Sequence, residues 1–213
     1  MKNPLLLSTV FSIFFALTAN AQARLDKPKV YLGTSHGVTA STVHSDPALN
    51  LDNLLFGYNG GLSFRFISDK VVGIQLEANF SQRGWVEARN SYSRRLNYIE
   101  MPFLTHIYMG KRDVRFIIHL GPKIACFLSD NVLINNTGGA TDYQYTHPIE
   151  NKFEYGFAFG LGCEFQFGKQ LMGLEARGAY TLSDIFSNSK AAYFGYSRNL
   201  GLSLNLAWLF QVK

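Results

Sequence analysis

The chain has 213 residues and a formal net charge of +5; 47 % of its residues are hydrophobic and 15 % aromatic, but only 16 % are charged. A content of 18 Phe and 11 Tyr excludes intrinsic disorder, which needs few apolar and aromatic residues. The lack of a run of about 20 apolar residues argues against a helical membrane protein, and the basic excess is too mild and too scattered to indicate a nucleic-acid partner.

The N-terminus has the pattern of a secretory signal peptide. Lys2 provides the positive charge, residues 5–17 are mostly apolar, and the Ala-Asn-Ala sequence that ends at residue 21 matches a cleavage motif. A transmembrane anchor is disfavoured because the apolar stretch is short and no stop-transfer charges follow it. We therefore expect a cleaved signal peptide over residues 1–21 and a single domain over residues 22–213.

The remainder of the chain alternates apolar residues with small or polar ones, which is the pattern of β-strands with one apolar face. From Phe153 to Phe167 every odd position is apolar, and the even positions carry Gly, Ala, Glu and Gln. The alternation predicts eight strands, over residues 30–41, 56–66, 72–81, 96–109, 114–128, 153–167, 172–182 and 199–210. Eight is an even number, as closed barrels of bacterial outer membranes require.

Short and long connections alternate along the chain. The short ones are 68–70, 110–113 and 168–170, and the long ones are 42–55, 84–94, 129–151 and 184–194. Outer-membrane barrels show this asymmetry, with short periplasmic turns and long extracellular loops. The pattern predicts an eight-stranded antiparallel up-and-down barrel in the bacterial outer membrane, with both chain ends in the periplasm.

A soluble lipocalin-type barrel would place the apolar face inside and the polar face in water. The polar faces of these strands are rich in Gly, Ala, Ser and Asn and poor in charge, whereas a soluble surface is about a quarter to a third charged. Phe165, Phe167, Trp208 and Phe210 lie near the short-turn end, where an interfacial aromatic girdle is expected. The composition therefore favours a membrane barrel with its polar faces inside.

The inner faces carry equal numbers of positive and negative side chains. In a barrel of eight strands the interior is just wide enough for side chains to fill, and enclosed charges must pair because desolvating an unpaired ion costs several kcal/mol. We expect a filled lumen with a salt-bridge network rather than an open pore. The expected members are Arg65, Glu77, Arg83, Glu100, Arg115, Lys123, Glu154, Glu164, Glu175 and Arg177.

Other chemistry has weaker support. His106 and His119 are expected on the lumen face of neighbouring strands, with His106 opposite residues 115–119, where a lumen hydrogen bond is favoured over a metal pair. The sequence His44-Ser45-Asp46 has triad residue types, but neighbours on a strand point to opposite faces. We expect no catalytic residues, metal or cofactor.

The second long connection combines basic and aromatic residues at the expected extracellular rim. Its candidates for contact with lipopolysaccharide phosphates are Trp85, Arg89, Arg94 and Arg95, because guanidinium groups suit phosphate. Ordinary loop charge is the alternative interpretation and is favoured.

Several motifs resemble those of the PorT-type outer-membrane β-barrel family of Bacteroidetes-like bacteria. They are the Tyr-Ile-Glu-Met-Pro sequence at 98–102, the Gly-Pro-Lys sequence at 121–123, the Glu-Ala-Asn-Phe-Ser-Gln-Arg-Gly sequence at 77–84 and the Gly-Leu-Gly sequence at 160–162. The resemblance covers the mature chain, places Glu100 on the lumen face, and implies a non-enzymatic barrel with a role in secretion or envelope assembly. A departure is the C-terminus, where Gln211-Val212-Lys213 follows the last aromatic residue.

Taken together, these features predict a non-enzymatic outer-membrane barrel with a structural or interaction role in the envelope. Its expected partners are outer-membrane lipid and lipopolysaccharide, and the resemblance adds envelope or secretion-system proteins. Two alternatives stay open, an outer-membrane enzyme that modifies lipid A and a small-solute porin.

Overall fold

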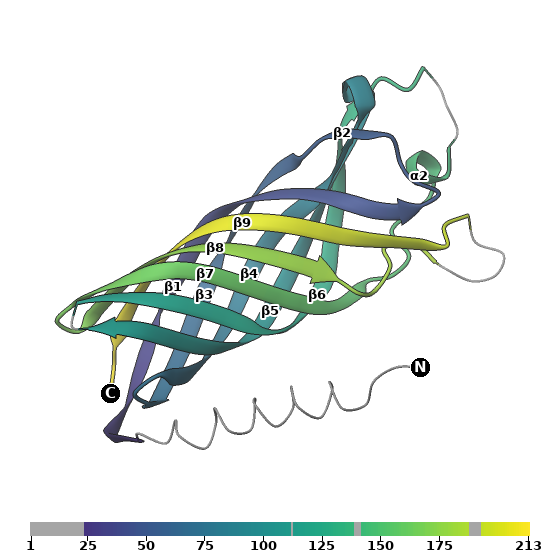
Figure 1. The fold of residues 1–213 in the computed structure, drawn as a ribbon. Helices are drawn as coiled ribbons and strands as arrows, with labels where there is room; N and C mark the ends of the chain where they lie inside the picture. The colour runs from purple at the N-terminus through teal and green to yellow at the C-terminus, as the bar shows by residue number, and fades with distance from the viewer. Residues whose placement is uncertain (1–23, 112, 139–141, 188–192) are drawn as a thin grey trace, which may run out of the picture.

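The computed structural model describes residues 24–111, 113–138, 142–187 and 193–213. The expected signal peptide lies outside them. The described chain is almost entirely β-structure, arranged as a closed ring of long antiparallel strands (Figure 1).

The ring contains eight long strands. These are β1 (Arg24–Asp46), β3 (Leu55–Asp69), β4 (Val72–Glu87), β5 (Tyr92–Lys111), β6 (Val114–Asn135), β7 (Phe153–Phe167), β8 (Gln170–Thr181) and β9 (Tyr196–Gln211). Each pairs antiparallel with the next along the chain, and β1 also pairs with β9, which closes the ring. The predicted eight-stranded antiparallel barrel is confirmed.

Three short elements lie at the long-loop end of the barrel. They are β2 (Leu51–Asn53), which pairs with β4, the 3₁₀-helix η1 (Ala88–Asn90) and the helix α2 (Tyr143–Thr146). No helix within the described residues is long and apolar enough to cross a bilayer.

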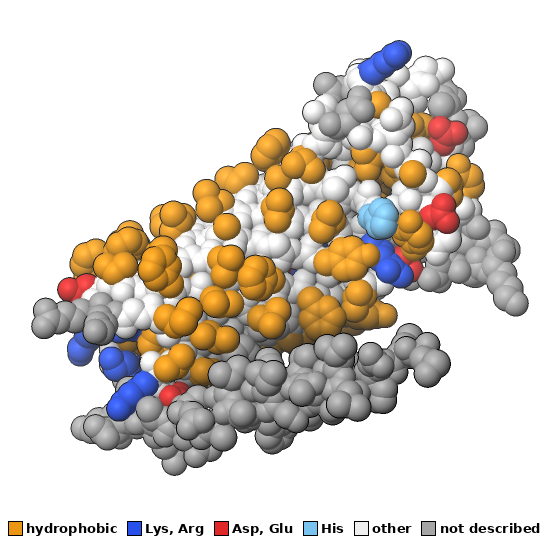
Figure 2. Space-filling view, in the orientation of Figure 1, with side chains coloured by type: hydrophobic (Ala, Val, Ile, Leu, Met, Phe, Trp, Pro, Cys, Tyr) orange, Lys and Arg blue, Asp and Glu red, His pale blue; other side chains and the backbone are white. Residues whose placement is uncertain are grey.

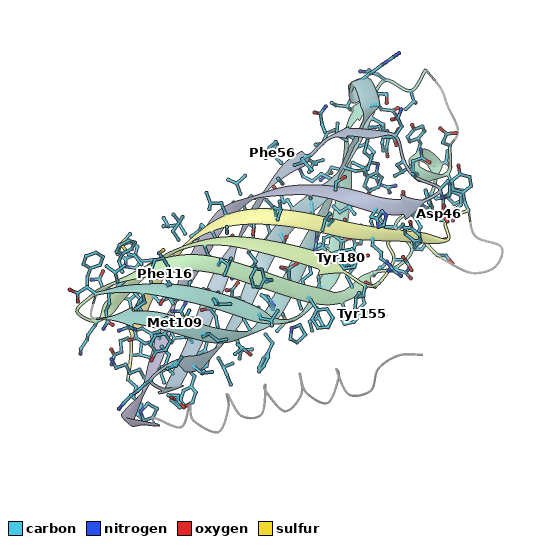
Figure 3. All side chains as sticks on the ribbon, viewed as in Figure 1. Asp46, Phe56, Met109, Phe116, Tyr155 and Tyr180 are labelled. Atoms are coloured by element: carbon cyan, nitrogen blue, oxygen red, sulfur yellow. The ribbon has the colours of Figure 1, made fainter. Side chains whose placement is uncertain are left out.

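The outer surface is covered with apolar side chains along the strands (Figure 2). Phe56, Leu62, Phe116, Phe167 and Leu202 are each more than 60 % exposed, and outward side chains such as those of Phe56, Phe116 and Met109 point away from the barrel (Figure 3). An apolar belt of this extent needs a cover, and hydrocarbon supplies it for a membrane barrel.

The strands are longer than the alternation predicted. Residues 84–87 continue β4 and residues 92–95 begin β5, so most of the connection expected over 84–94 is strand, and only η1 and Ser91 join the two. β6 pairs with β7 as far as Cys126–Phe153 and then continues beside β5 to Asn135. The extended parts of β4, β5 and β6 form a wall that rises beyond the rest of the barrel (Figure 1); we call it the raised wall.

Candidate functional site

All ten predicted lumen charges lie on strands of the ring. Nine of them have exposed fractions of at most 7 %, and Arg115, near the short-turn end, is half-buried. Their side chains alternate with the exposed apolar ones, because successive residues of a strand point to opposite faces. The structure brings the nine buried charges together in two layers inside the barrel.

Arg177 is central to the layer nearer the short turns. Its guanidinium lies 2.7 Å from Glu77 (Nη1 to Oε2) and 2.8 Å from Glu175 (Nε to Oε1). Glu77 is on β4, four strands away from Arg177 in the ring, so this pair crosses the lumen. One buried arginine thereby pairs with two buried carboxylates, each of which would be strongly destabilising without a partner.

A second ion pair crosses the same layer, between Arg65 on β3 and Glu164 on β7. Arg65 Nε also donates a hydrogen bond of 2.7 Å to Gln75 Oε1, and the Gln75 amide donates to Glu77. Gln75 was not among the predicted residues, although it occupies an inward position of β4. It connects the Arg65 pair to the Arg177 pair.

The two histidines complete this layer. His106 Nδ1 lies 2.8 Å from His119 Nε2, so the predicted hydrogen bond is present. His119 Nδ1 is 3.0 Å from Glu175 Oε2, and His106 Nε2 is 3.9 Å from Glu164 Oε2. These polar contacts link side chains from six strands into a closed loop. We call this set the lumen ring; it consists of Arg65, Gln75, Glu77, Arg177, Glu175, His119, His106 and Glu164.

The second layer lies nearer the long loops. Glu100 is 2.9 Å from both Arg83 Nη2 and Lys123 Nζ, and Arg83 is also 3.7 Å from Glu154. The Arg83 guanidinium lies over the Tyr98 ring, 4.3 Å from its centroid. A cavity of about 30 Å³ borders these groups, which leaves room for no more than about two water molecules.

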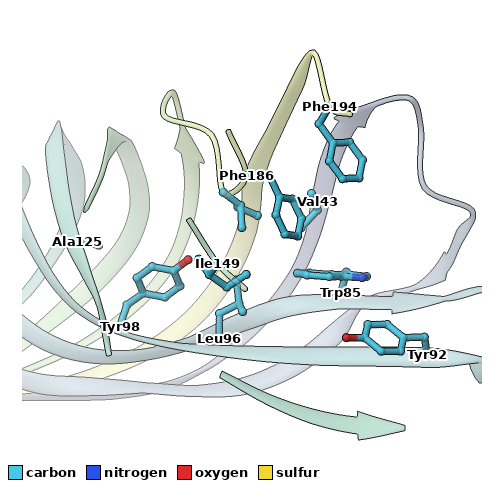
Figure 4. Packing of buried hydrophobic residues seen from close by; sticks show 10 residues of the cluster. Val43, Trp85, Tyr92, Leu96, Tyr98, Ala125, Ile149, Phe186 and Phe194 are labelled. Atoms are coloured by element: carbon cyan, nitrogen blue, oxygen red, sulfur yellow. The ribbon is translucent and has the colours of Figure 1, made fainter. Parts of the chain in front are cut away.

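Apolar side chains close both ends of the charged region. At the short-turn end, Tyr31, Ile67, Leu171 and Leu209 pack together with at most 1 % exposure. At the other end the apolar cluster is larger and includes loop residues (Figure 4); its members are Val43, Trp85, Tyr92, Leu96, Tyr98, Ala125, Ile149, Ile185, Phe186 and Phe194. The described side chains therefore fill the barrel along its length.

Arg115 differs from the other predicted lumen charges. It donates a hydrogen bond to Gln166, and its guanidinium lies 5.2 Å from the centroid of the Tyr108 ring. Since it is half-buried at the short-turn end, it retains contact with water, and a partner carboxylate is not needed to offset full desolvation.

Two of the four residues expected to contact lipopolysaccharide lie inside the barrel, which corrects that expectation. Trp85 is fully buried in the apolar cluster at the mouth, with its ring centroid 6.3 Å from that of Phe186. Arg94 is 2.7 Å from Asp130 and donates to the carbonyl oxygens of Gln144 and His147 at 3.1 and 3.0 Å. Neither side chain is on the outer surface that faces lipid.

The other two residues of that set reach the surface of the barrel. Arg95 is half-exposed and donates to the Phe56 carbonyl oxygen at 3.4 Å. Arg89 is exposed on η1, in a left-handed backbone conformation with φ of 56°.

Sequence reasoning missed an outward-facing basic group at the long-loop end of β9. Arg198 is about one-third exposed, 3.4 Å from Asp184, and its guanidinium lies 5.7 Å from the centroid of the Tyr196 ring. His44, which pairs in register with Arg198, is 3.4 Å from the Tyr196 hydroxyl. The even positions of β9 face outward, so continuing the alternation by two residues would have found Arg198.

The loop helix α2 is fixed to the raised wall by polar contacts. Besides the bonds from Arg94, the Tyr145 hydroxyl donates to Glu87 at the end of β4. Burial and this bond raise the pKa of Tyr145 above its ordinary value, because ionisation would place a second negative charge beside the carboxylate. In the part of the chain that the structure describes, no group of three or more His, Cys, Asp or Glu has an arrangement that could hold a metal ion.

Solved structures of outer-membrane proteins are similar to this chain. OprG from Pseudomonas aeruginosa matches with 12 % identity and a TM-score of 0.51, over 86 % of this chain and 94 % of that chain. Ail, the attachment invasion locus protein of Yersinia pestis, matches with 15 % identity and a TM-score of 0.46, over 84 % and 98 %. Neisserial surface protein A matches with 12 % identity and a TM-score of 0.46, over 85 % and 98 %.

At 12 % identity the likeness to OprG shows a shared fold, and no curated protein matches the chain. The model of the outer membrane protein beta-barrel domain family matches residues 20–187, which is more than half of the chain. That match agrees with the closed eight-stranded ring and its apolar outer belt. The chain therefore belongs to the outer membrane protein beta-barrel domain family.

Proposed function

We propose that this protein is a non-conducting and non-enzymatic barrel with a structural or interaction role in the cell envelope. The observation that carries this proposal is the filled interior, in which two layers of paired charges lie between two apolar layers. An ion that crossed it would have to separate buried pairs and then enter apolar packing, and both steps are strongly unfavourable.

Planar-bilayer recording tests the closed lumen. The refolded protein is expected to give no large, steady conductance at either polarity. A matched variant that removes apolar volume at both ends, Leu171→Ala with Phe194→Ala, shows whether the apolar layers contribute to closure. Large and steady steps from the unsubstituted protein would favour a small-solute porin and overturn the closed lumen.

The raised wall is the surface that we propose for protein partners. Within the described residues, β6 pairs with β7 only as far as Cys126, so residues 128–135 have β5 on one side and an open edge on the other. An open edge can accept a strand from another chain, and Val132 and Leu133 on it are about half exposed.

We further propose that the protein is a PorT-type barrel with a role in secretion. This part of the proposal rests on the motif resemblance. A photoreactive amino acid in place of Val132 is expected to crosslink to an envelope protein in cells. The same photoreactive amino acid in place of Leu204, which faces lipid, is expected to capture no protein. Capture of a secretion-system component would support the secretion role. Equal capture at both positions would count against the raised wall as the partner surface.

The absence of enzyme activity is tested separately. His44 and Asp46 share the outer face of β1, but Ser45 points inward with 5 % exposure. A triad needs its nucleophile and base within hydrogen-bond reach, and this segment separates them. Lipid A mass spectra from cells with and without the protein are expected to be identical. Loss of an acyl chain or phosphate only with the protein would favour a lipid A-modifying enzyme.

Lipopolysaccharide is the lipid partner that we propose, with contacts at the outward basic groups. Arg198 and Arg95 lie on the barrel surface at the long-loop end, and Arg89 is exposed on η1. Guanidinium groups bind phosphate with paired hydrogen bonds. Replacing all three with Ala is expected to weaken lipopolysaccharide binding, while Arg115→Ala at the short-turn end leaves it unchanged.

Export through a cleaved signal peptide completes the proposal. N-terminal sequencing of the protein from outer membranes is expected to begin at Gln22. Recovery of a chain that starts at Met1 would contradict cleavage.

A further inference from the structure

Four extracellular segments meet around a pocket of about 530 Å³ at the long-loop end of the barrel. The segment before β2 contributes Asn50, the end of β4 contributes Glu87, and α2 contributes Gln144 and Tyr145, while Tyr193 closes another side. This volume falls within the range of roughly 300–1,000 Å³ that is typical of small-molecule sites. The pocket is separate from the lumen and does not depend on whether the lumen conducts.

The lining of the pocket combines carboxylates and amides with aromatic rings. Glu87 is 6 % exposed and accepts hydrogen bonds from the Tyr145 hydroxyl and, at 3.4 Å, from the Gln144 amide. These bonds fix its carboxylate at the pocket wall. Asp142 adds a second carboxylate, and Asn50 adds an amide.

The tyrosine in this wall is held in place by its neighbours. The Tyr145 ring lies 4.5 Å from that of Tyr92 on β5, which belongs to the apolar cluster at the mouth. Since Tyr92 is itself buried, the Tyr145 ring is supported from behind. A flat aromatic surface that is held rigidly can accept a second flat apolar face with little loss of conformational entropy.

We propose that this pocket binds an uncharged sugar of one or two rings. Sugar hydroxyls are hydrogen-bond donors, and carboxylate and amide oxygens are the acceptors that the pocket supplies. The C–H face of a sugar ring is apolar and fits a tyrosine surface. Glu87 and Asp142 would repel an anionic sugar, whereas Arg89, which lines the same pocket, disfavours a fully cationic ligand.

Calorimetric titration of the refolded full-length barrel tests this proposal. The probes are glucose, N-acetylglucosamine, maltose and chitobiose, each at up to roughly 10 mM, which is the range for weak single-sugar binding. Spermidine and a sulfated disaccharide serve as cationic and anionic comparisons. Glu87→Gln keeps the size of the side chain but removes its charge, and Glu150→Gln is the matched control on an exposed loop carboxylate outside the pocket lining.

At least one neutral sugar is expected to bind, and Glu87→Gln is expected to weaken it about tenfold while Glu150→Gln leaves it unchanged. A second variant, Ala48→Trp, places a large side chain at an exposed position of the pocket lining and is expected to abolish binding. Heat-dependent mobility on a detergent gel verifies that each variant is folded. Absence of binding by all four sugars overturns the proposal, as does binding of spermidine alone or binding that Ala48→Trp does not change.

Discussion

His106 on β5 and His119 on β6 face each other inside the barrel, with His106 Nδ1 2.8 Å from His119 Nε2. A neutral imidazole has one donor and one acceptor nitrogen, so one ring donates this bond and the other accepts it. His119 also contacts Glu175, and His106 lies near Glu164. The histidine pair thus bridges two carboxylates that are each bound to an arginine.

Removing one histidine opens the lumen ring. His119→Ala removes the hydrogen-bond partner of His106 Nδ1 and the contact of His119 Nδ1 with Glu175, and a buried group left unsatisfied costs about 1–3 kcal/mol. We expect the free energy of unfolding, measured by urea titration in detergent, to fall by about that amount. His44→Ala, at an exposed position, is the control and should have little effect. Equal stability of the two variants would show that the histidine contact contributes nothing.

Arg177 has the largest expected effect on stability. Arg177→Met keeps most of the side-chain volume but leaves Glu77 and Glu175 as buried charges, which costs about 3–5 kcal/mol. Adding Glu77→Gln removes one of those charges, so the double variant should recover part of the loss. Arg115→Met, in the half-buried site at the short-turn end, should cost less than about 1 kcal/mol. A double variant less stable than Arg177→Met would contradict the pairing.

Gly160 allows Glu175 to reach its partners. A Cβ at Gly160 would collide with the Glu175 carboxylate, which is held by Arg177 and His119. We expect Gly160→Val to slow folding into detergent and to lower the unfolding temperature. Gly173→Val is the matched control on β8, because a Cβ there would meet its nearest neighbour at an ordinary contact distance of 3.5 Å. The prediction fails if the two variants behave alike.

Arg94 connects the third long loop to the raised wall. Arg94→Ala removes the bonds to the Gln144 and His147 carbonyl oxygens and leaves Asp130 without its ion pair. Limited proteolysis should then cut residues 136–150 several times faster, since local opening exposes a loop to protease, while the barrel stays resistant. Arg95→Ala is the control, because it changes a neighbouring arginine that does not contact α2. In this variant the loop should be cut at the original rate.

Tyr145 makes the attachment of α2 to the raised wall dependent on pH. Its pKa is raised because of burial and the bond to Glu87, so the folded state favours the neutral hydroxyl. The stabilisation is complete below the ordinary pKa of tyrosine and is lost as the pH rises through the elevated value. Proteolysis of the loop should therefore stay slow at neutral pH and accelerate only in strong alkali. Tyr145→Phe should remove that alkaline dependence.

The alternation of residues was enough to predict the barrel and its inner and outer faces. Because the period of a strand is two, a run such as residues 153–167 assigns every side chain to one face before any partner is known. The equal numbers of inward charges then indicated a filled lumen, since an enclosed ion needs a counter-ion. The mouth was harder to predict, because bulges at Ser93/Arg94 and Asn97/Tyr98 shift the alternation of β5.

Which charges meet was decided only by the tertiary structure. Arg65 pairs with Glu164 and Arg177 with Glu77 across the lumen, between strands four apart in the ring. Alternation fixes the face of a residue but not its depth, which depends on the register of all eight strands together. Trp85 illustrates the same limit. Its place in the sequence predicted a side chain at the rim, whereas packing against the folded loops buries it at the mouth of the barrel. The sequence thus determined the barrel and its polar interior, and the closed ring set the pairing inside it and the packing of its mouth.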